Sequence, residues 1–501
     1  MLASVRAATL SGVRGAPVDV EVHVGNGLPG FTVVGLPDAS CREARDRVRA
    51  ALICSGEDWR NRRVTVNLAP SGVPKSGAGL DLAIAIGLLV AWEDLEPSAV
   101  ESVGFLGELG LDGSLRPVRG ALAMVDAMDV DAVVVCNANA AETALLNGPQ
   151  VHAFGDLTSL LRSLRRQEPW PDQQHHLNHK RRRESLDLRD VRGQAVAKRG
   201  LEIAGAGGHH LMLIGPPGAG KTMLAKLINS LLPHLSDEAS AEVTRIHSVA
   251  GELVETDGWH RDPPFRSPHH SASPVSLIGG GTAMMRPGEL ALAHRGVLFL
   301  DELGEFSPVA LDGLRQPLEE GEVRVTRAHS TERYPAESLV VAAMNPCPCG
   351  ESGAPGSCRC SDVARARYHR RVSGPLLDRF DLRLNVQRPS VEELFGSCEG
   401  ETSAMVRERV AAAQHIAIER SGVLNGRLSS AQIEATVPLS IAAQSVLESS
   451  IHQGRLSARG VGRIRVVART IADLDERYGP VEVEDVCLAL SLRVDPFGAL
   501  R

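Results

Sequence analysis

A glycine-rich segment at residues 215–222 constrains this chain more than any other feature. It has the sequence GPPGAGKT and matches the pattern G-x-x-x-x-G-K-[ST] at every position. Residues 209–214 before it form an apolar run that predicts a short buried strand, and residues 223–232 predict a helix that stops at Pro233. A strand, a glycine-rich turn and a helix in this order place backbone N–H groups and a helix N-terminus around a phosphate group. The sequence therefore predicts a phosphate-binding loop within an α/β domain.

This loop is expected to surround the triphosphate of ATP. Its glycines let backbone N–H groups turn toward the phosphate oxygens, Lys221 can reach the β- and γ-phosphates, and the Thr222 hydroxyl can ligate Mg²⁺. A chance glycine-rich turn is the alternative, and the strand before it and the helix after it argue against that interpretation. The predicted nucleotide-binding residues are Gly215, Pro216, Pro217, Gly218, Ala219, Gly220, Lys221 and Thr222.

Polar side chains follow two further apolar strands. Residues 296–300 are followed by Asp301 and Glu302, and residues 339–344 are followed by Asn345. At the tip of a parallel strand beside a phosphate loop, Asp301 is expected to hold the magnesium shell and Glu302 to polarise an attacking water. Asn345 could orient that water between the other two strand tips. Such a carboxylate pair can also cap a helix, but beside the phosphate loop it predicts ATP hydrolysis.

An arginine near the end of the same domain is a candidate for catalysis between subunits. Residues 373–381 have the sequence SGPLLDRFD, which contains Arg379. Phosphoryl transfer is accelerated by an arginine offered in trans, which requires a neighbouring subunit. An ordinary surface salt bridge is the alternative for this residue.

The motifs GPPGAGKT, VLFLDE, AMNPCPCG, SGPLLDRFD and SARGVGRIRVVARTIADL occur in this order. Over nearly the whole chain, this order resembles the magnesium-chelatase-like AAA+ ATPases, and most closely their YifB/ComM group. The resemblance implies that Asn345 is sensor 1, that Arg379 is the arginine finger, and that a lid arginine is sensor 2. Arg463 is the first choice for sensor 2, with Arg459 and Arg465 as alternatives. The resemblance also implies a homo-hexameric ring, and for the ComM branch ATP-driven branch migration of DNA during natural transformation.

The sequence pattern predicts an α/β fold in several regions. Valines alternate with polar residues between positions 18 and 24, which is typical of a half-buried strand. Ser40 and Glu43 resemble a capping box at the start of a helix that runs to about residue 53. Further predicted elements are strands at 63–69 and 132–136, a buried helix at 80–91, and C-terminal helices at 441–451, 464–474 and 481–492. The predicted domains are 1–165, a linker at 166–190, an AAA+ core at 191–390 with a cysteine-rich insert at 347–360, and a helical lid at 391–501.

Two motifs in residues 1–165 resemble the Lon protease fold (S5 domain 2-like). They are LAPSGVPKSGAGLDLA, which starts at Leu68, and GELGLDGSLRP, which starts at Gly107. Lon-type proteases use a Ser–Lys dyad, and the resemblance puts Gly79 in the serine position and Leu122 in the lysine position. It therefore implies a protease-like scaffold without peptidase activity, similar to the terminal domain of the recombination protein RadA. A rival dyad would consist of Lys75 with Ser71 or Ser76.

Four cysteines form a C-x-C…C-x-C pattern. Cys347 and Cys349 are separated by eight residues from Cys358 and Cys360. Four thiolates suit tetrahedral Zn²⁺, so a structural zinc site is predicted. Reduced loop cysteines and an iron–sulfur cluster are the alternatives. His269 and His270 could also be metal ligands, but histidines that form local hydrogen bonds in a loop are the preferred interpretation.

The charge distribution constrains where nucleic acid could bind. A net charge of −7 argues against a uniformly basic surface, although a local basic strip is compatible with it, and 3% aromatic residues disfavour a base-stacking platform. Arg324 and Arg327, on a predicted hairpin at 322–334, are the preferred DNA contacts, because the resemblance places this insert at a ring's central channel. The basic run that ends the linker at Arg183 could touch nucleic acid, but a solvated linker is the preferred interpretation. The arginines at 365–371 and those at 455–463 are open between DNA, ATP and subunit contacts.

Location and rival functions complete the expectations. The longest apolar run, around residues 82–92, is shorter than the roughly 20 residues of a membrane span, and no secretory signal is evident, so a cytoplasmic protein without a membrane partner is expected. One rival function is a chelatase-type motor that drives metal insertion through partner subunits. The other is a non-enzymatic adaptor whose ATP site controls assembly, against which Glu302 argues because a pure binding site needs no water-activating carboxylate.

Overall fold

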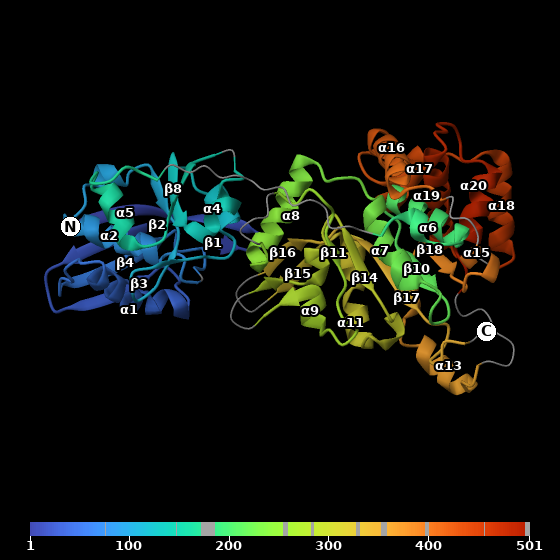
Figure 1. Ribbon diagram of the computed structural model, residues 1–501, viewed down its shortest axis with the longest axis horizontal. Helices are drawn as coiled ribbons and strands as arrows, with labels where there is room; N and C mark the ends of the chain where they lie inside the picture. The colour runs from blue at the N-terminus through green and yellow to red at the C-terminus, as the bar shows by residue number, and fades with distance from the viewer. Residues whose placement is uncertain are drawn as a thin grey trace.

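The computed structural model describes residues 1–75, 77–146, 148–171, 186–253, 259–281, 285–326, 331–351, 358–395, 400–454 and 456–495. An N-terminal α/β region lies at one end of an elongated molecule, a central parallel sheet lies in the middle, and the C-terminal helices lie at the other end (Figure 1). Some sequence predictions fall outside the described residues, namely those for Ser76, Arg327, Arg455 and residues 172–185 of the linker.

The N-terminal region is built on a seven-stranded mixed sheet of order β3-β4-β2-β1-β5-β8-β9. Val18, Val20 and Val22 are buried on β2, so the alternating pattern marks the face of the strand that packs on the core. The elements are β1 (Leu2–Ser11), β2 (Arg14–Gly25), β3 (Gly30–Val34), α1 (Ala39–Cys54), β4 (Arg63–Ala69), α2 (Asp81–Ala91), β5 (Val103–Phe105), β6 (Glu108–Leu109), β7 (Leu115–Arg116), α3 (Ala121–Asp126), β8 (Ala132–Cys136), α4 (Asn137–Thr143), β9 (Gln150–Phe154) and α5 (Leu157–Leu164).

Local predictions for this region are largely confirmed, with one correction at a helix cap. Strands β4 and β8 have the predicted bounds, and every residue of α2 is buried. Helix α1, however, is capped by Asp38, whose side chain accepts a hydrogen bond from the Cys41 N–H at 2.8 Å. Ser40 therefore lies inside the first turn, and the predicted capping box with Glu43 is wrong. The Asp38 carboxylate is an equally good cap two residues earlier.

The central region contains a five-stranded, fully parallel sheet of order β11-β14-β17-β10-β18. Alternate residues of β10 enter different cores: Leu211 and Leu213 face one, and Met212 and Ile214 face the other. The elements are α6 (Ala195–Gly207), β10 (Leu211–Ile214), α7 (Lys221–Leu231), α8 (Asp237–Ala250), β11 (Phe265–Arg266), α9 (Pro274–Ile278), β12 (Gly279–Gly280), β13 (Arg286–Pro287), α10 (Glu289–Leu292), β14 (Val297–Leu300), α11 (Pro308–Gly313), α12 (Arg315–Glu320), β15 (Glu322–Thr326), β16 (Thr331–Pro335), β17 (Leu339–Met344), α13 (Asp362–His369), α14 (Gly374–Leu377) and β18 (Leu382–Asn385).

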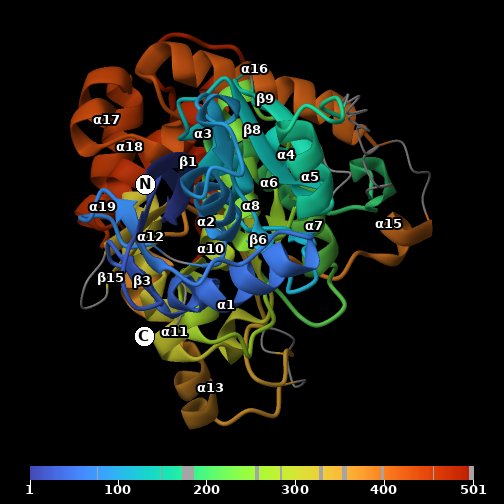
Figure 2. The same ribbon diagram turned by 90° about the vertical axis from the view of Figure 1, so that its left-hand side faces the viewer.

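The C-terminal helices cover the face of this sheet that carries α6 and α7, and they share its core. Viewed from the end that carries the N-terminal region, they lie on one side of the central region, whereas α13 lies at the opposite side (Figure 2). No helix in the described ranges is long and apolar enough to cross a bilayer. The elements are α15 (Val391–Phe395), α16 (Ser403–Ser421), α17 (Ser430–Thr436), α18 (Ile441–His452), α19 (Ala458–Leu474) and α20 (Val483–Ser491).

The N-terminal region contacts the central region through α3, α4 and α8. The Gly120 N–H donates to the Ser248 carbonyl oxygen at 3.0 Å, and the Ser248 hydroxyl donates to Glu142 at 2.5 Å. Arg245 on α8 pairs with Asp126 at 2.9 Å. These contacts hold the N-terminal region on the side of the central region away from the C-terminal helices.

Candidate nucleotide site

The phosphate loop connects the carboxyl end of β10 to the first residue of α7. Gly218 and Gly220 have φ angles of +76° and +88°, a left-handed conformation that glycine adopts without steric cost. Gly215 is required for a close approach, since a Cβ at this position would lie 2.0 Å from the Val386 carbonyl oxygen. The conformation of the loop therefore explains all three glycines of the sequence motif.

The side chain of Lys221 contacts both the loop itself and Asn345, the residue that follows β17. Its Nζ donates to the carbonyl oxygens of Gly215 at 2.7 Å and Pro216 at 2.9 Å, and to the Asn345 Oδ1 at 3.1 Å. Burial lowers the pKa of Lys221, against the opposing charge of Asp301. Because β17 lies between β14 and β10, Asn345 occupies the position between the strand tips that the sequence predicted.

The predicted magnesium ligands are also brought together. The Thr222 hydroxyl donates to the Asp301 Oδ2 at 2.8 Å, and the Glu302 N–H donates to the Asp301 Oδ1 at 2.9 Å. A hydroxyl and a carboxylate are hard oxygen ligands of the kind that Mg²⁺ prefers, and a basic side chain and loop N–H groups suit phosphates. The residues present therefore fit both ATP and Mg²⁺.

Glu302 has a partner that the sequence did not predict. Its Oε2 lies 2.9 Å from the Nδ1 of His270, and its backbone has a left-handed φ of +51°. The ring of His269 stacks on that of His270 with centroids 4.1 Å apart, and the Nδ1 of His269 lies 2.8 Å from the Ser271 hydroxyl. Local hydrogen bonding, as predicted, describes His269 but not His270.

Arg379 and the lid arginine Arg463 lie near the amino end of β18, in the central sheet. Arg379 and Asp381 immediately precede β18, and the Arg463 guanidinium lies 3.4 Å from Asp381. Strands β10 and β18 are parallel, and the phosphate loop follows the carboxyl end of β10. The residues before β18 therefore lie at the amino ends of the strands, opposite to the phosphate loop. Within one chain, neither Arg379 nor Arg463 joins Lys221 and its neighbours.

These arginines surround a cavity of about 430 Å³. Arg379 donates to the carbonyl oxygens of Arg315 at 3.0 Å and Pro375 at 2.7 Å, and it also contacts Glu319. Arg459 lies at the same cavity, 4.0 Å from Glu319.

The third candidate for sensor 2 has a different environment. Arg465 donates to the Val437 carbonyl oxygen at 2.8 Å and pairs with Glu434 on α17. The structure therefore groups Arg379, Arg459 and Arg463 and places Arg465 elsewhere.

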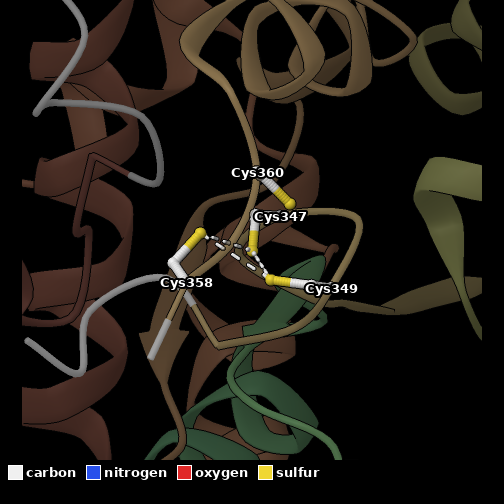
Figure 3. A group of neighbouring side chains, drawn as sticks. All are labelled: Cys347, Cys349, Cys358 and Cys360. Carbon is white, nitrogen blue, oxygen red and sulfur yellow. Dashed lines mark hydrogen bonds between the residues drawn. The ribbon is translucent and has the colours of Figure 1, made fainter. Parts of the chain in front are cut away.

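The four cysteines predicted as metal ligands point toward one another (Figure 3). The Sγ atom of Cys347 lies 3.3 Å from that of Cys349 and 3.8 Å from that of Cys358, and the Cys349–Cys358 distance is 3.7 Å. All four sulfur atoms lie within 4.8 Å of one another, and each cysteine is a free thiol. A tetrahedron with Zn–S bonds of about 2.3 Å has S···S edges of about 3.8 Å. The thiols therefore fit a tetrahedral metal ion.

This cluster is close in space to the phosphate loop. A Cβ on Gly350, next to Cys349, would lie 2.5 Å from the Pro217 Cδ. Cys347 follows Asn345 by two residues. Hydrogen bonds from the backbone N–H groups of Glu351 and Arg359 lower the pKa of Cys349 to about 6.

Several of the arginines considered for DNA binding that lie in the described ranges have acidic partners. The predicted hairpin is present as β15 paired antiparallel with β16, and Arg324 on it pairs with Glu322 at 2.6 Å and Glu320 at 3.5 Å. Arg371 pairs with Glu305 at 2.8 Å. These side chains do not form an unbroken basic strip, so charge alone does not identify a DNA path.

The structure describes two of the three residues of the rival dyad, Lys75 and Ser71, whereas Ser76 lies outside the described residues. Lys75 is 1% exposed and its ammonium donates to the Pro70 carbonyl oxygen, while Ser71 is exposed. Burial lowers the pKa of Lys75. A Cβ at Gly79 would be in van der Waals contact with Leu106 at 3.5 Å, and Leu122 is buried.

Three family models match successive parts of the chain. The family model described as magnesium chelatase, subunit ChlI, matches residues 187–394. The models for subunit ChlI of Mg-chelatase and for the ChlI C-terminal part match residues 20–139 and 400–493. The chain is 43% identical over 474 residues to the uncharacterized protein YifB of Escherichia coli, which covers 93% of this chain and 92% of that protein.

Two further relatives are informative. The chain is 42% identical over 481 residues to the competence protein ComM of Haemophilus influenzae, with 94% of each chain covered. A partial match to Lon protease 2 of Bacillus subtilis is 27% identical over 150 residues, which is 29% of this chain and 27% of that protein.

Proposed function

Because the chain belongs to the magnesium-chelatase-like YifB/ComM family, we propose that it is a Mg²⁺-dependent ATPase that assembles as a homo-hexameric ring and remodels DNA. Family membership supports an ATPase role. Two contacts carry the proposal, from Lys221 to Asn345 and from Thr222 to Asp301. Both lie at the carboxyl ends of the strands of a parallel sheet.

The residues at the carboxyl ends of the strands have different proposed roles in phosphoryl transfer. Lys221 and the loop N–H groups bind the β- and γ-phosphates, and Thr222 and Asp301 hold Mg²⁺, which neutralises negative charge on the phosphates when it is bound. Glu302 accepts a proton from the attacking water, and Asn345 orients that water. Each role needs a side chain at the carboxyl ends of the parallel strands, where all five residues lie.

The arginines at the amino ends of the strands support the proposal that two neighbouring subunits form each ATP site. Arg379 and Arg463 lie near the amino end of β18, whereas their own phosphate loop follows the carboxyl end of the parallel strand β10, so each is proposed to contact the nucleotide of a neighbouring subunit. A positive charge offered in this way stabilises the negative charge that spreads over the transferred phosphoryl group. A ring of identical subunits repeats this contact at every interface.

The DNA role rests on two weaker observations. One relative with 42% identity is named a competence protein, which supports a role in competence. Within that role, DNA remodelling by branch migration during natural transformation is part of the proposal and rests on the family resemblance. Arg324 on the β15–β16 hairpin is proposed to face the DNA in the central channel, where it would exchange its glutamate partners for phosphates.

The remaining regions are proposed to support this motor. Residues 1–165 are proposed as a Lon-protease-like scaffold (S5 domain 2-like) without peptidase activity, 166–190 as a linker, 191–390 as the AAA+ core and 391–501 as its lid. The arrangement of Lys75 and the short match to a Lon protease support the first assignment. The four convergent thiols support a structural Zn²⁺ site at 347–360.

ATP turnover with and without forked DNA tests the proposal. Wild type is expected to hydrolyse ATP faster with DNA, Lys221→Ala to lose nucleotide binding, and Glu302→Gln to bind ATP and assemble but hydrolyse very slowly. Glu419→Gln on α16 changes an exposed carboxylate outside the site and serves as the matched control. Stimulation only by a porphyrin-binding partner would favour a chelatase motor instead, and assembly without any turnover would favour an adaptor.

A further inference from the structure

A buried pair of side chains contacts Arg463 where α19 packs on the central sheet. The His209 Nδ1 lies 3.0 Å from the Asp381 Oδ2, and the Asp381 Oδ1 lies 3.4 Å from the Arg463 guanidinium. His209 is fully buried and Asp381 is 2% exposed, whereas the Arg463 side chain is 32% exposed. The arginine is therefore the outermost of the three, and it lines the cavity that it shares with Arg379.

Helix α19 contacts this pair at two positions. The His209 Nε2 lies 2.7 Å from the Thr470 Oγ1, and Thr470 follows Arg463 on α19 by about two helical turns, which places both on one face. The Thr470 hydroxyl also accepts a hydrogen bond from the Asn425 side chain at 3.0 Å. His209 and Asp381 therefore bind the same helix at two points, which fixes the rotation of α19 and with it the direction of Arg463.

Asp381 is ionised in this environment. Burial opposes the ionisation of its carboxyl group, but the hydrogen bond with His209 and the charge of Arg463 outweigh burial and lower the pKa of Asp381. An ionised carboxylate accepts hydrogen bonds and donates none, so the His209 Nδ1 donates to it. The carboxylate therefore presents a fixed negative charge to the Arg463 guanidinium.

We propose that His209 and Asp381 are positioning residues that direct Arg463 toward the nucleotide of a neighbouring subunit. This inference rests on the proposed function of Arg463. His209 precedes β10 and Asp381 precedes β18, so both lie at the amino ends of the strands, whereas Lys221 lies beyond the carboxyl end of β10. Loss of either side chain should therefore impair the neighbour's site and leave the subunit's own nucleotide site intact.

Steady-state ATP turnover of His209→Ala and Asp381→Asn tests this role. Each variant is expected to lower kcat about tenfold, because an unrestrained Arg463 spends less time in the orientation that stabilises the transition state. The KM for ATP is expected to change less than about twofold, since the weakened interaction is made only in the transition state. His209→Asn keeps an N–H donor near the Nδ1 position and should restore most of the wild-type kcat.

A double variant shows whether His209 acts through Arg463. His209→Ala, Arg463→Ala should hydrolyse ATP no more slowly than Arg463→Ala alone, because a positioning effect disappears with the group that is positioned. A purely structural defect would instead add its own loss to that of Arg463→Ala.

A steric change at the same contact provides a variant that keeps the histidine, in case His209→Ala does not fold. A Cβ on Gly207 in α6 would lie 2.1 Å from the His209 Nε2 and 2.5 Å from the Thr470 Oγ1, so Gly207→Ala displaces the ring. It should lower kcat as His209→Ala does. Gly205→Ala in the same helix is the matched control, because its Cβ would make an ordinary contact with Leu232 at 3.5 Å and should leave kcat unchanged.

Mixed rings separate an effect on the neighbour's site from damage to the subunit's own site. When His209→Ala is mixed with Glu302→Gln, the intact base of the first subunit can face a correctly directed Arg463 from the second. Turnover per chain should therefore rise above the average of the two proteins measured apart, as it should for Arg463→Ala mixed with Glu302→Gln. If His209 supported only its own phosphate loop, mixing would give that average and no more.

Three results would overturn the positioning role while leaving the ATPase intact. They are a wild-type kcat in His209→Ala or Asp381→Asn, an additive loss in the double variant, and no rise on mixing His209→Ala with Glu302→Gln although the Arg463→Ala mixture rises. Absence of turnover in wild type, or no rise in the Arg463→Ala mixture although mixed rings form, would instead overturn the proposed function of Arg463, and this inference with it.

Discussion

Loss of one thiol from the cysteine cluster is expected to remove a metal ion and to weaken ATP binding. We consider Cys349→Ser, because Cys349 is exposed and its replacement leaves no cavity, whereas Cys347 is buried. A serine hydroxyl is a poor ligand for a soft metal site. The expected result is a purified protein without the zinc of the wild type.

The magnitude follows from the geometry of the cluster. Sulfur atoms at 3.3–3.8 Å need little rearrangement to reach tetrahedral edges, so the site is close to preformed. Structural Zn²⁺ binds thiolate sites with roughly 10–16 kcal/mol at neutral pH. Cys349→Ser removes one of four thiolate ligands, so about a quarter of this free energy, roughly 2.5–4 kcal/mol, should be lost. This loss corresponds to a metal affinity about 10²–10³-fold weaker.

ATP binding is expected to weaken because the cluster adjoins the phosphate loop in two ways. Gly350 packs against Pro217 of the loop, and Asn345, which contacts Lys221, lies two residues before Cys347. Loosening of the cluster should therefore raise the KM for ATP. Elemental analysis should give about one zinc per wild-type chain and well below that for Cys349→Ser, alongside ATP kinetics for both proteins. Cys487→Ser, a change at an exposed cysteine on α20, is the matched control.

Two results would refute this reasoning. Wild-type protein without zinc or iron would show that the thiols are not a metal site. A zinc-depleted Cys349→Ser protein with an unchanged KM would show that the cluster holds metal but does not support the phosphate loop.

Further outcomes follow from other contacts. Burial lowers the pKa of His210 to about 3 and that of His247 to about 4, so the unfolded chain takes up two protons that the fold excludes below about pH 6.5. Stability should therefore fall as the pH falls from 7 to 5, by roughly 2 kcal/mol per histidine at pH 5, and a melting temperature that stays constant or rises would contradict this. Gly350→Ala places a Cβ against Pro217 at a φ of +82° and should raise the KM for ATP, whereas Gly374→Ala, with open space around its Cβ, should not.

The buried strands and the glycine-rich turn at 215–222 could be predicted from the sequence because their signals are local. Residues 339–344 are a buried run bounded by polar residues, and β17 has these bounds. The Lys221–Asn345 contact could also be anticipated, because parallel strands bring their carboxyl ends to one edge. In each case a short stretch of sequence determines the outcome.

Other features depend on contacts between distant segments. The pairing of His270 with Glu302 requires β11, a strand of two residues that is too short to show a periodic pattern. The common cavity of Arg379 and Arg463 depends on how α19 packs on the central sheet. The Asp38 cap was missed because several residues near the start of α1 can cap a helix, and only the backbone geometry selects one.

Mixing two inactive variants tests the central claim most directly. Glu302→Gln lacks the base, and Arg379→Ala lacks the arginine that is proposed to act on a neighbour's nucleotide. In a mixed ring, an Arg379→Ala subunit with its intact Glu302 can face an intact Arg379 from a Glu302→Gln subunit, so ATP turnover should reappear on mixing. If the mixture stays as inactive as its components although mixed rings form, or if Arg379→Ala alone hydrolyses ATP at the wild-type rate, the shared-site account is contradicted.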